Sequence, residues 1–337
     1  MKAIINLGAL SRNVSKIQQL AGTQNIIAMV KANAYGHGLI PVGQFLESQG
    51  VKCFGVATVE EGEDLRAAGI QSKILLMSGA GICFAAERIL KAHLTPLVSS
   101  IEELEILNNL GKKLAIHIDL DTGMSRGGFQ VSNLNAAINW LTHEKHYLDL
   151  EGLCTHFANA EKPDCEFSKI QLREFTKAKE KFEAAGFRPS MVHVSKSSAI
   201  TNRIGLPDAW VRPGIALYGG CEGFEPVMSL LAPVTLVKTL QAGQTVGYDQ
   251  TWQASRETKI ALLRAGYGDG YPRALSNTGP ILGRVSMDLI TLDATDLDLK
   301  VGDWVPLMSI LEIARACQTI PYEILTRVAQ RTQRLYR

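Results

Sequence analysis

Over its first 220 residues, the 337-residue chain alternates between short apolar segments rich in β-branched residues and longer helical segments. Two of the helical segments, "VEEGEDLRAAG" and "IEELEILNNLG", end at a glycine, the residue that commonly terminates a helix. Such alternation predicts a parallel sheet. Eight strands within about 200 residues favour a (β/α)8 TIM-like barrel over an open sheet. The apolar segments are residues 25–31, 53–58, 73–79, 94–99, 114–120, 150–157, 191–195 and 210–218.

The pattern changes near Pro226. Segments such as "APVTLVKTL", "TKIALLRAGYG" and "GDWVPLM" are short, strand-like and separated by turn residues, and a short helix is expected near "PYEILTRVAQ". This pattern of short strands separated by turns predicts a mostly antiparallel β domain. We therefore expect two domains, a barrel over residues 1–222 and a β domain over residues 223–337.

Composition excludes several classes of protein. The formal net charge is +2, and the Arg-rich segment 327–337 reads as a solvated end, so no nucleic-acid partner is expected. The six cysteines form no C-x-x-C pair and no secretory leader precedes them, which indicates reduced thiols in a cytoplasmic protein. No apolar run approaches the ~20 residues of a membrane span.

Charged and polar residues gather where the predicted strands end. The active site of a (β/α)8 barrel lies at the carboxyl ends of its strands. Any one of these residues alone could be a solvated rim residue, but together they predict an active site. They are Lys31, Asp119, Asp121, Arg126, His156, His193, Ser197 and Arg212.

The stretch "AMVKANAYGHG" places Lys31 at the mouth of an apolar strand. Such a setting lowers the pKa of an ammonium and permits a Schiff base. A snorkelling lysine is the alternative, but it suits an edge strand better. The segments "SKSS" (195–198) and "RPGIALYG" (212–219) supply hydroxyls and small residues where such barrels bind a phosphate. A lysine opposite a phosphate cradle suggests pyridoxal 5'-phosphate.

The motifs "MVKANAYGHG", "DTGMSRGGF", "THFA", "RPGIALYGG", "VGY", "AGYGDGYPR" and "GRVSMD" occur in the order and context of alanine racemase. The chain resembles this family over essentially its whole length. The resemblance implies a pyridoxal-phosphate enzyme with an N-terminal barrel and a C-terminal β domain. It also implies a homodimer in which each active site borrows residues from the partner's β domain.

The resemblance further implies roles for individual residues. Lys31 would be the Schiff-base lysine and the base on one face of the substrate Cα, and Tyr248 of the other subunit the base on the opposite face. Tyr35 follows Lys31 too closely to be that second base. The phosphate would be bound by Tyr35, Ser197, Gly214 and Ile215.

The remaining roles implied by the resemblance concern the pyridine ring of the cofactor and the entrance to the active site. Arg212 would face the pyridine nitrogen and be held by His193, while Arg126 would face the phenolic oxygen and His156 would hydrogen-bond Tyr248. Met287, with Asp288 beside it, would lie near the substrate carboxylate. Tyr267 would line the entry corridor.

Three positions depart from the family pattern. Many members carry a carbamylated lysine where this chain has Asp119, a carboxylate that could orient Arg126 without modification. Lys196 stands where asparagine is usual, which adds a cation beside the phosphate site. Gln330 stands where some members have a tyrosine, which bears on specificity for alanine.

The sequence thus favours an alanine racemase that supplies D-alanine for peptidoglycan. A racemase of broader range, acting on serine for example, is the first alternative. A non-catalytic pyridoxal-phosphate-binding protein is disfavoured by the β domain with Tyr248. A decarboxylase of related fold is disfavoured by Arg212, since such enzymes usually place a carboxylate at the pyridine nitrogen.

Overall fold

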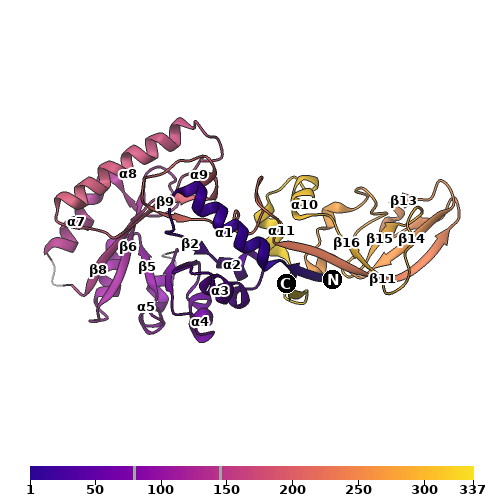
Figure 1. Ribbon diagram of the computed structural model, residues 1–337, viewed down its shortest axis with the longest axis horizontal. Helices are drawn as coiled ribbons and strands as arrows, with labels where there is room; N and C mark the ends of the chain where they lie inside the picture. The colour runs from indigo at the N-terminus through magenta and orange to yellow at the C-terminus, as the bar shows by residue number, and fades with distance from the viewer. Residues whose placement is uncertain (79–80, 144–145) are drawn as a thin grey trace. The chain divides into compact units, whose positions relative to one another are not determined.

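The computed structural model describes residues 1–78, 81–143 and 146–337, and the chain forms two compact units (Figure 1). The barrel unit comprises residues 13–34 and 39–217. The sheet unit comprises residues 1–12, 35–38 and 218–337. The units therefore interleave along the chain, which the sequence did not indicate. Gly79, the last residue of the apolar segment 73–79, lies outside the described residues.

Eight strands of the barrel unit pair in parallel in the order β10-β9-β8-β6-β5-β4-β3-β2. The two ends of this series also meet: Ile26 bridges Val211 in parallel, and Met29 N donates to Pro213 O at 3.1 Å. The strands are β2 (Ile27–Met29), β3 (Cys53–Val56), β4 (Lys73–Leu76), β5 (Thr95–Val98), β6 (Leu114–Asp121), β8 (Leu148–Cys154), β9 (Met191–Lys196) and β10 (Trp210–Arg212), with β7 (Phe129–Gln130) paired to β6. The predicted barrel is confirmed.

Helices follow most of the barrel strands, as Figure 1 shows. Local signals explain several of them: Thr58 and Ser100 accept hydrogen bonds from the third backbone N–H of α4 and α6. The longest, α8, buries Phe175 and Phe182. The helices are α1 (Leu7–Ala21), α3 (Leu39–Ser48), α4 (Val59–Ala67), α5 (Ile82–Lys91), α6 (Ile101–Asn108), α7 (Leu134–His143), α8 (Glu166–Ala184) and α9 (Ser197–Thr201).

The sheet unit is built on strands in the order β15-β14-β11-β1-β17, with β16 also paired to β11. All of these pairs are antiparallel except β1 with β17. The predicted mostly antiparallel β domain is confirmed. Its elements are β1 (Lys2–Ile5), β11 (Met228–Leu240), β12 (Thr245–Val246), β13 (Trp252–Gln253), β14 (Thr258–Leu263), β15 (Ile290–Asp293), β16 (Trp304–Pro306), α10 (Ile310–Ala316), α11 (Pro321–Arg327) and β17 (Gln333–Tyr336).

The first strand of the chain, β1, is an interior strand of this sheet, next to the edge strand β17. β1 pairs with β11 on one side and with β17 on the other, so both ends of the chain complete one hydrogen-bonded ladder. Ala3 and Ile5 are fully buried, whereas Ile4 faces the partly exposed side. Within the described ranges, no helix is long and apolar enough to cross a membrane.

Ile5→Ala should lower the free energy of unfolding by about 2–5 kcal/mol, because it removes buried methylenes and leaves a cavity. Urea denaturation followed by tryptophan fluorescence measures the loss. Ile4→Ala is the matched control, and its cost should be clearly smaller. Equal costs at the two positions would contradict a buried role for one face of β1.

Candidate functional site

The strand β2 passes directly into a left-handed turn, α2 (Lys31–Tyr35). The backbone of residues 32–35 has φ between 51° and 54°, a region that non-glycine residues rarely occupy in succession. Ala34 N donates to Val30 O at 2.7 Å, which closes the turn onto the strand. Strained backbone of this kind persists only where the surroundings fix it, and it gathers at functional sites. The turn fixes the position of Lys31 relative to the barrel.

Glu61, in the first turn of α4, holds this left-handed segment. Its Oε1 accepts from Ala32 N at 2.5 Å, and its Oε2 accepts from Ala57 N at 2.8 Å. Glu61 also completes the capping box with Thr58. One carboxylate therefore ties the mouth of β2 to the loop before α4.

The amine of Lys31 is shielded from water among cations. Burial lowers its pKa, and the charges of Arg126 and Arg212 lower it further. Glu61 is the opposing influence and raises the pKa. A lysine in this environment gives up its proton more readily than an exposed one, as a nucleophilic or basic amine requires.

Arg212, at the end of β10, is 4% exposed and is surrounded by neutral acceptors. Its Nη1 donates to His193 Nδ1 at 2.6 Å and to the carbonyl oxygen of His193. Its Nη2 donates to Thr155 O at 2.7 Å and to His156 Nδ1 at 3.4 Å. His193 thus lies against Arg212, and these contacts fix the plane of the guanidinium.

His156 is a neutral imidazole. Burial, followed by the charges of Arg212 and Arg126, lowers its pKa to about 2. Because Nδ1 accepts from Arg212, the ring proton lies on Nε2. His156 can therefore donate one hydrogen bond from Nε2.

Asp119 and Arg126 line one cavity of about 320 Å3, together with Thr155 and His156. Burial raises the pKa of Asp119, whereas the charges of Arg212 and Arg126 lower it. Asp119 Oδ1 accepts from Cys154 Sγ at 3.5 Å. Asp119 and Arg126 are thus within electrostatic reach of each other at the ends of β6 and its following loop.

Ser197 and Gly214 lie side by side at the ends of β9 and β10. Ser197 Oγ accepts from Gly214 N at 3.0 Å and from Ala216 N at 3.2 Å. Ile215 lies between these amides and is buried. Lys196, beside Ser197, is paired with Glu161 at 2.7 Å, so its charge is already balanced by a carboxylate.

The sheet unit carries the other candidate residues, and most are exposed. Tyr248, in a 3-10 turn after β12, is 66% exposed, and Met287 is 53% exposed. Tyr267 N donates to Ser286 O at 3.1 Å, which joins the loops of Tyr267 and Met287. Tyr35 also belongs to this unit; its ring stacks on Tyr218 at 4.9 Å between centroids.

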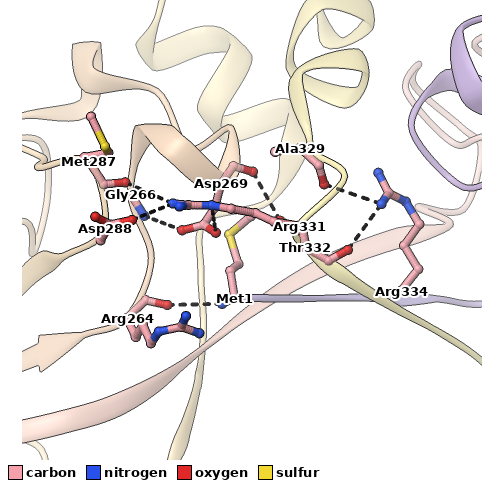
Figure 2. Close-up of polar contacts among 10 residues, drawn as sticks. All are labelled: Met1, Arg264, Gly266, Asp269, Met287, Asp288, Ala329, Arg331, Thr332 and Arg334. Atoms are coloured by element: carbon pink, nitrogen blue, oxygen red, sulfur yellow. Dashed lines mark hydrogen bonds and ion pairs between the residues drawn. The ribbon is translucent and has the colours of Figure 1, made fainter.

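Arg331 joins these two loops from a third segment, as Figure 2 shows. Its Nε donates to Asp269 Oδ1 at 2.9 Å, and its Nη2 donates to Asp288 Oδ1 at 2.7 Å and to Met287 O at 3.4 Å. Asp269 Oδ2 in turn accepts from Gly266 N at 3.1 Å. The backbone is packed so closely that a Cβ at Gly266 would lie 2.3 Å from Met287 O.

Sequence reasoning missed Glu61 and Arg331 as supporting residues. Glu61 had a visible local signal, since Thr58 and Glu61 form the T-x-x-E pattern of a capping box. Its contact with Ala32, however, comes from the fold. No sequence motif marked Arg331, which lies in the arginine-rich segment 327–337.

Fold and site together define a (β/α)8-barrel enzyme with a partly buried lysine near arginines and neutral histidines at the carboxyl ends of the strands. Residues 5–222 match the family described as "Alanine racemase, N-terminal domain", and residues 227–336 match "Alanine racemase, C-terminal domain".

Proteins that are similar over nearly the whole chain are also alanine racemases. Alanine racemase of Alteromonas mediterranea is 36% identical over 99% of this chain and 98% of its own, and that of Carboxydothermus hydrogenoformans is 35% identical over the same shares. The crystal structure of alanine racemase from Streptomyces lavendulae superposes with a TM-score of 0.92 at 30% identity, over 100% of this chain and 96% of the other.

The Bartonella henselae enzyme, solved with covalently bound pyridoxal phosphate, has a TM-score of 0.88 at 31% identity over 100% and 99% of the two chains. The chain belongs to the alanine racemase family. Its resemblance to that family and its assignment as an isomerase, an amino-acid racemase, are confirmed.

Glu61→Gln should lower the pKa of Lys31, because it removes the carboxylate that raises this pKa. The rate of acylation of Lys31 in the cofactor-free protein, followed against pH by mass spectrometry, measures the change. Its midpoint should move to lower pH. Glu60→Gln is the control, since Glu60 is paired with Arg88 at 2.7 Å. An unchanged or higher midpoint in Glu61→Gln would show that Glu61 does not act on the amine.

Proposed function

We propose that the chain interconverts L-alanine and D-alanine with pyridoxal 5'-phosphate, as a cytoplasmic homodimer that supplies D-alanine for peptidoglycan. The observation that carries this proposal is the partly buried Lys31 amine, whose pKa is lowered by burial and by the charges of Arg126 and Arg212, in a chain of this family. The domain roles follow: residues 1–222 bind the cofactor, and residues 223–337 contribute to the partner's active site.

The barrel residues fit this cofactor. Lys31 offers an amine that deprotonates readily, and Arg212 offers a guanidinium already fixed by neutral acceptors. Ser197, Gly214 and Ile215 form the barrel part of the proposed phosphate site, and Tyr35 is proposed as a further phosphate ligand. When bound, pyridoxal phosphate acidifies the Cα–H of an amino acid by withdrawing electrons from it.

Racemisation requires a proton to leave one face of Cα and another to arrive at the opposite face. Lys31 serves one face and Tyr248 of the partner subunit serves the other. A phenol acts as a base only when its anion is stabilised. His156 supports its anion, because the neutral imidazole carries its proton on Nε2 and can donate to the phenolic oxygen.

Arg212 limits the reaction to proton exchange. A guanidinium does not give up its proton, so it cannot protonate a ring nitrogen placed against it. With the cofactor bound, such a contact would reduce delocalisation of the electron pair into the ring and favour return of a proton to Cα. Arg212 thereby disfavours transamination and decarboxylation.

Arg126 would bind the phenolic oxygen of the cofactor and the substrate, and Asp119 would orient it. The shared cavity and the mutual electrostatic influence of the two side chains support this role. Asp119 replaces the carbamylated lysine of other members. Met287, Asp288 and Tyr267 line the entrance and the substrate side of the partner's site.

The exposure of Tyr248, Tyr267 and Met287 in a single chain supports a shared site. Large side chains of this kind at the surface mark places that a partner covers. A two-fold dimer would put each sheet unit's tyrosine into the other protomer's barrel.

Purified protein with pyridoxal phosphate should racemise alanine, and should do so faster than serine, lysine or arginine. Borohydride reduction followed by peptide mapping should place the pyridoxyl group on Lys31. Absence of alanine racemisation would overturn the proposed function, and a label on another lysine would overturn the site.

Tyr248→Phe should bind the cofactor but lose racemisation by about 10²-fold or more, the contribution of a positioned acid–base group. Absorption spectra report cofactor binding, and a coupled D-alanine assay reports turnover. Turnover near that of the wild type would remove Tyr248 from the mechanism.

Mixing inactive Lys31→Ala with inactive Tyr248→Phe should restore activity, because one site of each heterodimer regains both bases. Distinct affinity tags on the two variants confirm subunit exchange. Confirmed heterodimers that stay inactive, while both parents fold, would mean that the two bases belong to one protomer.

A further inference from the structure

A chain of hydrogen bonds crosses the interior of the barrel unit from Arg212 to the opposite end of the strands. His193 Nδ1 lies 2.6 Å from Arg212 Nη1, and His193 Nε2 lies 2.7 Å from His117 Nδ1. His117 Nε2 lies 3.3 Å from Glu151 Oε2. The other carboxylate oxygen of Glu151 accepts from Lys73, the first residue of β4. The interior of such a barrel is normally filled with branched apolar side chains.

The groups at the two ends of the chain, a guanidinium that can only donate and a carboxylate that can only accept, require the same direction of hydrogen bonding. A guanidinium donates and never accepts, so His193 Nδ1 must be the acceptor. A neutral imidazole that accepts at Nδ1 carries its proton on Nε2, and His193 therefore donates to His117 Nδ1. By the same rule His117 donates from Nε2 to Glu151. Each step fixes the tautomer of the next.

The protonation states of the histidines and of Glu151 are consistent with hydrogen bonds donated from Arg212 toward Glu151. Burial lowers the pKa of His117 and of His193, so both rings are neutral. The hydrogen bond from His117, followed by that from Lys73, lowers the pKa of Glu151 to about 2. The arrangement is one carboxylate, two neutral rings and one guanidinium, with the anion two side chains away from Arg212.

The backbone makes room for the chain at one glycine. Gly152 lies opposite His117 in the β6–β8 pair. A Cβ at Gly152 would lie 2.4 Å from His117 Nδ1, so the imidazole occupies the space of a side chain there. The dipeptide Glu151-Gly152 thus supplies both the terminal acceptor and the space for the ring.

We propose that Glu151 is a remote positioning residue for Arg212, because its carboxylate fixes the direction of the hydrogen bonds that two buried histidines carry between them. Without a strong acceptor at its far end, the chain could reverse, and His193 would then present an N–H to the guanidinium. Arg212 would lose its shortest side-chain acceptor, one of the contacts that fix the plane of the guanidinium. The consequence for catalysis rests on the proposed function, in which Arg212 faces the ring nitrogen.

The first test needs no cofactor and no activity. Nitrogen-15 NMR of histidine-labelled apoprotein reports which ring nitrogen of each histidine carries the proton, and His117→Asn and His193→Asn assign the two signals. Both rings should be protonated on Nε2 and bare on Nδ1. A proton on Nδ1 of either ring would overturn the proposal.

The second test uses the competition between His117 and Lys73 for one oxygen. The amide of Glu151→Gln has a single acceptor, which the ammonium of Lys73 attracts, so the amide N–H2 turns to His117 and favours the reversed chain. We expect kcat to fall about tenfold, as for other outer positioning partners, and more pyruvate to form from alanine per racemisation event as the cofactor is converted to its amine form.

Lys73→Met is the matched control, and it should keep kcat within about threefold of the wild type because Glu151 remains an acceptor for His117. The double variant Glu151→Gln with Lys73→Met should recover most of the lost kcat, since the amide oxygen is then free for His117. Unchanged kcat and pyruvate ratio in Glu151→Gln, or no recovery in the double variant, would overturn the proposal.

The racemase function and the role of Glu151 are separate proposals, and either can fail without the other. Failure of the wild type to racemise alanine would overturn the proposed function, and the tautomer measurement would then decide by itself whether the chain runs in the proposed direction. Should Glu151→Gln not fold, the tautomers of the wild-type apoprotein alone decide. Wild-type racemisation with a reversed tautomer would refute the role of Glu151 and keep the racemase.

Discussion

The buried guanidinium of Arg212 requires hydrogen-bond acceptors from several elements of the barrel unit. Arg212 is almost without solvent, and a buried charge is costly unless it is hydrogen-bonded. The fold meets this cost with neutral acceptors from neighbouring strands and loops, namely two imidazole nitrogens and backbone carbonyls. Because those acceptors come from β9 and from the end of β8, the position of Arg212 depends on barrel closure.

The same positive charge shapes its neighbours. It contributes to the lowered pKa of Lys31 and to that of His156, so a base and a neutral hydrogen-bond donor arise from one source. Glu61 works in the opposite direction on Lys31 while it fixes the strained turn that carries the amine. A carboxylate that anchors the backbone thereby also limits how far the lysine pKa can fall.

Much of the fold could be predicted because its signals are local. Each barrel strand is an apolar run, and helices such as α8 are recognisable from the spacing of their buried residues. The strand β1 could not be predicted, since "KAII" is too short to stand out and its partners lie more than two hundred residues away. The helix α10 was missed although Ser309 and Glu312 form a capping box.

The residues of the candidate site also fall into two groups, those that could be found from the sequence and those that could not. Lys31, His156 and Arg212 lie at or just after strand ends and could be found by position, whereas His193 lies within β9. The barrel places His193 and His156 on Arg212. Asp119 and Arg126 were found likewise and share a cavity. Glu61, Glu151 and Arg331 act through contacts that only the tertiary structure creates, so no spacing in the sequence reveals them.

The distance between Glu151 and Arg212 has a physical consequence of its own. A carboxylate in direct contact with the guanidinium would cancel most of its field at the opposite end, since Coulomb energy falls with separation and the pair would act as a dipole. With two neutral rings between them, the guanidinium keeps its orientation and most of its positive potential. That potential opposes a proton on any ring nitrogen placed against it. The proposed role of Arg212 uses both a fixed orientation and a positive charge, and a chain of two imidazoles provides the first while keeping the Glu151 carboxylate away from the second.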